Sequence, residues 1–436
     1  MRISGIELHS IAIADPPLRS SYGLHAPWAL RTIVELETDD GICGVSETYG
    51  GEAPRAALEA VRERVLGMDP FRLAELWEGM NAGARGSDAT VPGGHSQTWL
   101  VPGENPLDQN ARTFAAIEIA CLDIIGKAVG RPVCDLLGGR VRSKVPFSAY
   151  LFYKHAGGGG DDYPDEYGEV LTPEALVREC RQMVDRYGFK EVKLKGGVLD
   201  PEIEIESIRA LRREFGTNVP LRIDPNCAWS IDTSVHVGEL LKDELSGGGY
   251  LEDPCPGLDG MSAVRKRLMH RGISTPFASN VAVTSFPDVP RARDLDAVQI
   301  VLCDPHYWGG LRQVQLLSHL CSVLNIGLSM HSNSHLGVSL MAMTHVAAAC
   351  PNLTFACDTH YPWQTERDEV VGGGRIWFTE GSVAIPDRPG LGIELDYDQI
   401  ARSEERYAKI PLRRRDDEAE MRKHVDPNWK RVLPRW

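Results

Sequence analysis

Two lysines stand on one apolar segment at a spacing that could support acid–base chemistry. Lys193 and Lys195 alternate with Val192 and Leu194, and a Gly-Gly pair follows. On a strand, residues i and i+2 point to the same side, so the two ammonium groups share one face. Aimed into a pocket, each cation would depress the pKa of the other, and a lysine tuned in that way can act as a base near neutral pH. On an ordinary edge strand the same lysines would simply face water.

Three side chains with oxygen donors follow later apolar segments at equal spacing. Asp224, Glu252 and Asn280 lie 28 positions apart in each case, which is the length of one strand-and-helix unit. Oxygen ligands on successive strands are what Mg²⁺ requires, with water or substrate completing the octahedron. Taken singly, an Asp-Pro or Glu-Asp-Pro is typical of a turn or helix cap, so only the joint pattern predicts a metal site.

Acids and histidines follow the next apolar segments. Asp304 begins Asp-Pro-His, His331 begins His-Ser-Asn, and Asp358 begins Asp-Thr-His. The active site of an α/β barrel lies at the C-terminal ends of its strands, so these groups are expected to meet the lysines there. A lone His331 could be a satisfied core histidine, but seven consecutive strands that end in polar groups favour a site. Other histidines of this region have no such positional argument and are expected to be structural: His306, His319, His335 and His345.

These residues need a scaffold that gathers strand ends, and the chain from about 145 onward alternates two patterns. Strand-like segments are 145–153, 191–195, 221–224, 250–252, 277–279, 298–303, 327–331 and 354–358. Helical patterns between them cover 173–187, 201–214, 231–243, 259–270, 310–325 and 336–349. Eight strands with intervening helices predict an α/β barrel, without a regular final helix. A doubly wound open sheet is the alternative, weakened because no G-x-G-x-x-G follows the first strand.

The rest of the chain predicts a second unit. Strand patterns cover 3–14, 28–38 and 42–47, and helical patterns follow at 53–66, 70–82 and 108–128. We therefore expect an α+β domain over residues 1–130, a barrel domain over 140–385, and a segment 386–436 that returns to the first domain.

Composition limits the partners and the location. The chain has 436 residues, 42% of them hydrophobic, and a net charge of −14. These values indicate a globular protein and, without a long basic run, no nucleic-acid partner. No apolar run reaches the roughly 18 residues of a membrane span, and no signal peptide opens the chain, so we expect no membrane association. Ten cysteines without a Cys-x-x-Cys favour buried thiols in a reducing cytoplasm.

The strand-end motifs resemble those of the enolase superfamily, and within it the glucarate dehydratase subgroup, over essentially the whole chain. The shared pieces are residues 193–199, 224–229, 250–255, 275–280, 304–308, 331–335 and 358–363. The Lys-x-Lys is common in the superfamily, whereas Asp-Pro-Asn, an Asn in place of a third acidic ligand, and His-Ser-Asn are together much narrower. The resemblance implies a modified TIM barrel of the (β/α)7β type under an N-terminal α+β capping domain.

The resemblance also implies ligand sets. Mg²⁺ would be held by Asp224, Glu252 and Asn280. Substrate carboxylates and hydroxyls would contact His25, Tyr150, Lys193, Asn226, Asn280, Ser332, Asn333, His360 and Arg415.

The implied reaction is loss of water from an acid sugar. Removing a proton α to a carboxylate creates a dianion, which needs the positive charge of Mg²⁺ and Lys193. Lys195 and His331, the latter oriented by Asp304, would be bases on opposite faces of the substrate, and His331 would assist the leaving hydroxyl as general acid. A neutral Asn280 leaves less negative charge in the site, which should favour a dicarboxylate.

Three features leave the substrate and one ligand open. The loop 85–107 is longer than expected for the family, and Ala115 stands where the family presents a substrate-contacting threonine. Asp259 is an alternative carboxylate to Glu252. The resemblance implies a homo-oligomeric, Mg²⁺-dependent dehydratase of a sugar diacid, namely D-glucarate and L-idarate, giving 5-keto-4-deoxyglucarate, and the cysteines already favour a cytoplasmic location. The alternatives are a dehydratase or epimerase of another hexarate or aldonate, and a catalytically silent barrel that binds a sugar acid, which the two bases argue against.

Overall fold

The N-terminal domain, or cap, is built on an antiparallel sheet of three strands. In the computed structural model, which describes residues 1–81, 106–158 and 163–436, the strands are β1 (Ile3–Ala14), β4 (Trp28–Thr38) and β5 (Cys43–Tyr49), in the order β1-β4-β5. The β4–β5 hairpin turns at Gly41, whose φ of 77° is a conformation that glycine adopts without steric cost. A short ribbon of β2 (Arg19–Ser20) and β3 (Gly23–Leu24) follows β1.

Helices connect this sheet to the barrel. They are α1 (Glu52–Val65), α2 (Leu73–Asn81), α3 (Pro106–Val129) and the short α4 (Val133–Leu136). The helix α3 packs against β4 and β5 on one side and against barrel helices on another. Its apolar residues recur at helical spacing, and Ile117, Cys121 and Ile124 are fully buried. Of the predicted loop 85–107, residues 85–105 lie outside the described residues, and α3 begins at Pro106.

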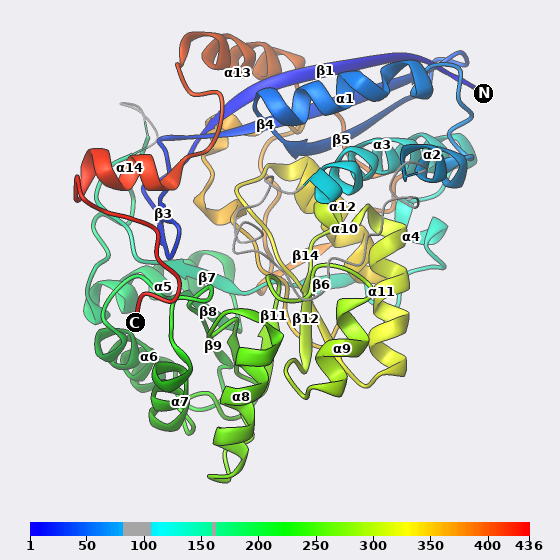
Figure 1. Ribbon diagram of the computed structural model, residues 1–436. Coiled ribbons are helices and arrows are strands. Elements are labelled where there is room, and N and C mark those ends of the chain that lie inside the picture. The colour runs from blue at the N-terminus through cyan, green and yellow to red at the C-terminus, as the bar shows by residue number, and fades with distance from the viewer. Residues whose placement is uncertain (82–105, 159–162) are drawn as a thin grey trace.

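The second domain is a parallel sheet curled into a barrel with helices outside it (Figure 1). Its strands are β7 (Ala149–Phe152), β8 (Val192–Lys195), β9 (Leu221–Asp224), β10 (Tyr250–Glu252), β11 (Phe277–Ser279), β12 (Ile300–Cys303) and β13 (Gly327–Met330), each hydrogen-bonded to the next. The helices are α5 (Pro173–Tyr187), α6 (Pro201–Phe215), α7 (Ile231–Leu240), α8 (Gly257–Met269), α9 (Asp288–Asp294), α10 (Pro305–Trp308), α11 (Leu311–Val323) and α12 (Gly337–Ala349).

Residues 353–358 close the barrel without forming a regular strand. Asp358 N donates to Met330 O at 2.8 Å, at the β13 edge, and Ser148 N donates to Cys357 O at 2.9 Å, just before β7. The segment thus bridges both open edges of the seven-stranded sheet. Two 3₁₀ turns, η3 (Tyr361–Trp363) and η4 (Glu366–Asp368), take the place of a final helix.

Other elements differ from the sequence prediction in detail. The predicted strand 145–153 is two strands, β6 (Lys144–Pro146) and β7, because Pro146 has no N–H to continue a ladder. β6 pairs instead with β14 (Ser382–Ala384). The helix α9 was not predicted.

The C-terminal segment packs first against the cap and then against the barrel. The helix α13 (Tyr397–Lys409) packs on β1, and α14 (Asp417–His424) packs on β3, as Figure 1 shows for these red elements beside the blue sheet. The chain then ends where Ser230 N donates to Trp436 O at 2.6 Å. Within the described residues, no helix is long and apolar enough to cross a bilayer.

Two cap carboxylates fix the starts of barrel helices. Glu118, on α3, accepts from Leu311 N at 2.7 Å and from Arg312 N at 3.1 Å, at the start of α11. Glu47, on β5, accepts from Leu336 N and Ser339 N at 3.0 Å each, at the start of α12. Helix starts carry unpaired N–H groups and partial positive charge, so these carboxylates hold cap and barrel in register.

Candidate active site

A cavity of about 410 Å³ lies where the barrel strand ends meet the cap and the C-terminal segment. Nine of the predicted site residues line it: His25, Tyr150, Lys195, Asn226, Asn280, His331, Asn333, His360 and Arg415. The other five contact this lining from behind, as the distances below show: Lys193, Asp224, Glu252, Asp304 and Ser332. The structure therefore gathers all the predicted residues at one end of the barrel.

Lys193 is a fully buried cation among carboxylates. Its Nζ lies 2.6 Å from Asp358 Oδ2 and 2.6 Å from Glu252 Oε2, and 4.8 Å from the centre of the Tyr150 ring. Burial would lower the pKa of Lys193, but Asp358 and Glu252 raise it well above its usual value. The expectation that the two lysines depress each other's pKa is therefore wrong for Lys193, because the nearby carboxylates raise its pKa by more than Lys195 could lower it. It is built to remain charged.

Lys195 reaches the cavity from the end of β8. Its Nζ donates to Asp224 Oδ2 at 2.7 Å, and Asp224 Oδ1 accepts from Asn226 N at 3.0 Å. The turn after β9 places Asn226 at φ 45°, and Tyr22 from the cap donates to Asn226 Oδ1 at 2.7 Å. The cap thus holds one of the predicted substrate contacts directly.

Oxygen atoms converge at the ends of β9, β10 and β11. One end of the Asn280 amide lies 3.2 Å from Glu252 Oε1, and the other end lies 3.3 Å from His331 Nε2. Burial and Asp224 raise the pKa of Glu252 well above its usual value, so these two carboxylates repel each other. The amide nitrogen donates to Glu252 in this arrangement, and half a turn of the amide would bring its oxygen beside the same carboxylates. Two buried carboxylates and an amide oxygen are donors that suit a hard cation, so Asp224, Glu252 and Asn280 fit Mg²⁺.

The alternative ligand Asp259 lies elsewhere. It is on α8, its side chain is 78% exposed, and it pairs with Arg291 at 2.9 Å. Asp253, which sequence reasoning did not single out, serves the site instead. It accepts from Ser279 Oγ at 2.6 Å and from Asn280 N at 2.9 Å, and so fixes the backbone that carries Asn280. Its position directly after Glu252 was the available signal.

His331 and Asp304 form a buried pair after β13 and β12. Nδ1 of His331 lies 3.3 Å from Asp304 Oδ2, and Nδ1 of His306 lies 2.7 Å from Asp304 Oδ1. Burial alone would raise the pKa of Asp304, but the two histidines lower it far below its usual value. An ionised Asp304 fixes the Nδ1–H tautomer of His331 and leaves Nε2 toward the cavity. His306 is anchored in turn by Ser339 at 2.8 Å.

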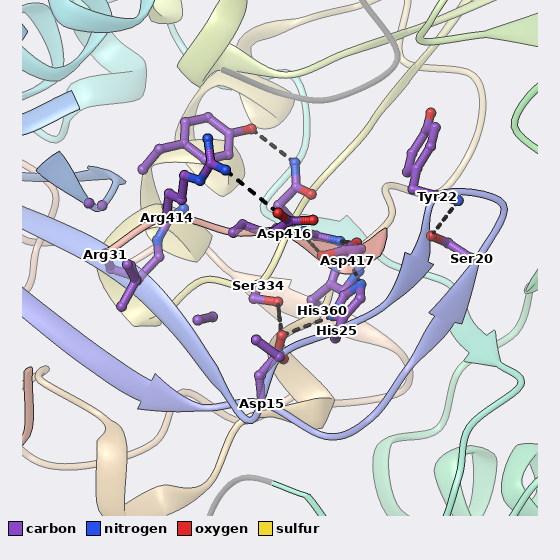
Figure 2. Close-up of a pocket in the computed structure, with 18 of the residues that line it drawn as sticks. Asp15, Ser20, Tyr22, His25, Arg31, Ser334, His360, Arg414, Asp416 and Asp417 are labelled. Atoms are coloured by element: carbon purple, nitrogen blue, oxygen red, sulfur yellow. Dashed lines mark hydrogen bonds and ion pairs between the residues drawn. The ribbon is translucent and has the colours of Figure 1, made fainter. Parts of the chain in front are cut away.

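A second group of predicted contacts lines the wall formed by cap, tail and barrel. His25 and His360 stack with ring centres 6.4 Å apart, and Figure 2 shows them together beside Asp417. His25 Nδ1 lies 2.9 Å from Asp15 Oδ2, and Arg415 Nη2 lies 2.8 Å from His25 Nε2. Because a carboxylate only accepts and a guanidinium only donates, His25 is the neutral Nδ1–H tautomer.

His360 is held as a neutral ring. Ser332 Oγ lies 3.2 Å from its Nδ1, and the Tyr150 ring lies edge-on with its centre 5.0 Å away. Burial and the neighbouring His25 lower the pKa of His360 well below its usual value. A neutral imidazole suits hydrogen bonding to hydroxyls.

Several site residues escaped sequence reasoning. Asp358 is predicted only as the end of the eighth strand-like segment. Asp15, which follows β1, is not among the predicted site residues, although an Asp-Pro at a strand end is a signal for it. Tyr49 closes β5, and its hydroxyl donates to Asp304 Oδ2 at 3.4 Å; no pattern marked it. Ala115 is fully buried on α3.

One other group in the described part of the chain could hold a metal ion. Glu7, His9 and Glu35 bring ligand atoms within 4.8 Å of one another. The group lies on the cap sheet, and Glu404 of α13 lies 3.0 Å from His9 Nδ1. Glu35 and Glu404 thus occupy both ring nitrogens of His9, so the group attaches α13 to the cap sheet.

Family comparisons agree with this architecture. Residues 17–138 match the family described as mandelate racemase / muconate lactonizing enzyme, N-terminal domain, and residues 175–400 match enolase C-terminal domain-like. The chain therefore belongs to the enolase superfamily.

Similar proteins cover its full length. A protein of Streptomyces coelicolor named probable glucarate dehydratase is 42% identical over 100% of this chain and 99% of its own. An enolase of Pseudomonas fluorescens, solved with magnesium, potassium and tartrate, is 44% identical with a TM-score of 0.92, over 100% of this chain and 99% of its own. An enolase of Thermobispora bispora, solved with magnesium and formate, is 44% identical with a TM-score of 0.91, over 100% of both chains.

Proposed function

We propose that this protein is a Mg²⁺-dependent hydro-lyase that dehydrates a sugar diacid, D-glucarate and its epimer L-idarate, to 5-keto-4-deoxyglucarate. One observation carries the proposal. Lys195 and His331, which lie on strand ends far apart in the sheet order, line the same cavity. Two potential bases that face one cavity suit proton removal from either of two epimers.

Lys195 or His331 takes the proton from the carbon next to a carboxylate, depending on the epimer. The electron pair moves into the carboxylate, and buried Lys193 stabilises the resulting dianion because its ammonium group remains charged. The neighbouring C–O bond then breaks while His331 donates a proton to the hydroxyl: the proton that it has just removed where His331 is the base, and a proton that it already carries where Lys195 is the base. Water leaves, and the enol product tautomerises to an α-keto acid.

Asp224, Glu252 and Asn280 would hold the metal ion. Mg²⁺, when bound there, supplies further positive charge beside the substrate carboxylate. The two solved relatives with bound magnesium support this assignment.

The rest of the lining suits a polyhydroxy acid. Neutral His25 and His360 and the amides of Asn226 and Asn333 supply donors and acceptors for hydroxyl groups. The name of the Streptomyces relative supports a diacid, and specifically glucarate, as the substrate.

The test is turnover by the purified protein with Mg²⁺ and a panel of sugar mono- and diacids, read as α-keto acid formed. Turnover of D-glucarate and L-idarate is expected. His331→Asn should lose dehydration of both acids, and Lys195→Ala should lose dehydration of the epimer whose proton Lys195 removes, each by about three orders of magnitude or more, while the circular dichroism spectrum stays native.

Other outcomes point elsewhere. Turnover of an aldonate or of another hexarate alone would replace the substrate and keep the reaction class. Thermal stabilisation by a sugar acid without any product would favour a silent binding barrel. Full activity in either single variant would refute its assigned role.

A further inference from the structure

A cationic side chain of the cap faces the cavity without an anionic partner in the described residues. Arg112, on α3, lines the cavity and is only 9% exposed. Its guanidinium carbon lies 4.8 Å from the centre of the Tyr49 ring. Its Nε is buried and has no hydrogen-bond partner among the described residues.

Two other arginines of the lining are engaged by carboxylates. Arg31 Nε donates to Glu47 Oε1 at 2.8 Å, and Arg415 Nε donates to Asp417 Oδ1 at 2.7 Å. Arg112 has no such ion pair within the described part of the chain. A buried charge without a counter-charge is costly, so an anion that enters the cavity would be bound where Arg112 lies.

The geometry of Arg112 suits a carboxylate. A guanidinium stacked on an aromatic ring keeps its N–H edges free, and these edges match the two oxygens of a carboxylate. Tyr49 also accepts from Asn333 Nδ2 at 2.9 Å and donates to Asp304 Oδ2 at 3.4 Å. A carboxylate on Arg112 would therefore lie beside the wall that carries His331.

On the basis of the proposed function, we propose that Arg112 binds the second carboxylate of the substrate and makes the enzyme selective for diacids over monoacids. Lys193 and the metal ligands serve the carboxylate next to the reacting carbon. The residue that tells a diacid from an aldonate is then on the cap, at a position that the motifs at the strand ends do not include.

The test compares two acids that differ only at one end, D-glucarate and D-gluconate. Their binding is measured by titration calorimetry with Mg²⁺ in the His331→Asn protein, which does not consume them. Adding Arg112→Met should weaken glucarate binding by about tenfold or more and change gluconate binding by less than about twofold. Arg112→Lys should retain part of the preference because it keeps the charge.

The matched control is Arg72→Met, which removes one charge from a cap arginine that is 63% exposed, and it should change neither affinity. An unchanged affinity for glucarate in the Arg112→Met protein would overturn the proposal. Equal weakening of both acids, or no initial preference for the diacid, would do the same. The reaction itself is tested separately by turnover in the wild-type protein, so loss of diacid selectivity without wild-type turnover would refute the reaction and keep the site.

Discussion

Lys193 and Asp358 lie 165 positions apart in the chain and are joined at 2.6 Å inside the barrel. The pair links β8 to the irregular segment that closes the ring. The two lysines of β8 therefore differ in environment. Lys193 is paired with buried carboxylates, and of the two only Lys195 lines the cavity.

Removing the Asp358 carboxylate should cost stability and activity together. We expect Asp358→Ala to lose on the order of 2–3 kcal/mol of unfolding free energy, less than a fully orphaned buried ion because Glu252 still faces Lys193. Urea unfolding followed by fluorescence measures it. Asp358→Asn keeps the shape and should fall between the wild type and the alanine variant, and equal stability of all three would contradict the assigned pairing.

Asp304 should affect the reaction rate by orienting His331. In Asp304→Asn the ring loses the partner that fixes its Nδ1–H, so kcat for D-glucarate should fall by roughly 10³-fold or more, as for other orienting carboxylates. Binding of glucarate, measured by calorimetry, should change much less. A large loss of affinity with an unchanged kcat would contradict a positioning role.

Removal of divalent cations should abolish activity and lower stability. With Mg²⁺ at about one hundred times its Kd, binding adds about 2.7 kcal/mol to the folded state, so the melting temperature should drop with EDTA and recover with Mg²⁺. Asn280→Ala should need more Mg²⁺ for half-maximal activity. Asp259→Asn, which changes an exposed carboxylate of α8, is the control and should leave the Mg²⁺ requirement unaltered.

The loop after Lys195 depends on one buried carboxylate. Glu204, on α6, accepts from Gly197 N at 2.9 Å, Val198 N at 2.8 Å and Leu199 N at 3.0 Å. Glu204→Ala leaves these donors unpaired, at about 1–3 kcal/mol each, so we expect a loss of about 3 kcal/mol or more and a lower kcat. Glu202→Ala, on the exposed side of the same helix, should change neither denaturant midpoint nor rate.

His9 and its carboxylate neighbours Glu35 and Glu404 should make the free energy of unfolding depend on pH. Hydrogen bonding to Glu35, opposed by burial and reinforced by Glu404, raises the pKa of His9. A raised folded pKa adds stability below the unfolded value of about 6.5, and this stability is lost as the pH rises through the folded value. The melting temperature of the wild type should therefore exceed that of His9→Gln at low pH and approach it above neutrality. His236→Gln, at an exposed histidine of α7, is the matched control for loss of an imidazole.

The barrel was predictable because its signals are local. Strands β9, β10 and β11 end where their apolar runs end, at Asp224, Glu252 and Ser279, and caps such as Thr172 mark helix starts. The residues that end each strand then share one edge by topology alone, which is why the lysines, the acids and His331 could be grouped from spacing.

The parts that were missed depend on contacts between distant segments. Tyr49 reaches Asp304 across the boundary between cap and barrel, and nothing near either residue in the sequence records that contact. The predicted strand 354–358 forms isolated bridges in place of a regular ladder, and Ala356 O accepts from the side chains of Arg222 and Ser329. The pKa of Lys193 was misjudged because its carboxylate neighbours come from two other strand ends.

The carboxylates that the cap inserts at the starts of α11 and α12 bear on how this fold can be recombined. Gly310 approaches Glu118 so closely that a Cβ there would lie 2.1 Å from Oε2, so the two sides of the boundary are fitted to each other atom by atom. A transplanted cap without a carboxylate at position 118 or 47 would leave N–H groups at the starts of α11 and α12 without these acceptors. A chimera between relatives must therefore take Glu118 with Gly310, and Glu47 with the turn at Leu336, from the same parent. Substrate selectivity that resides in the cap can then be exchanged only together with the matching parts of the barrel.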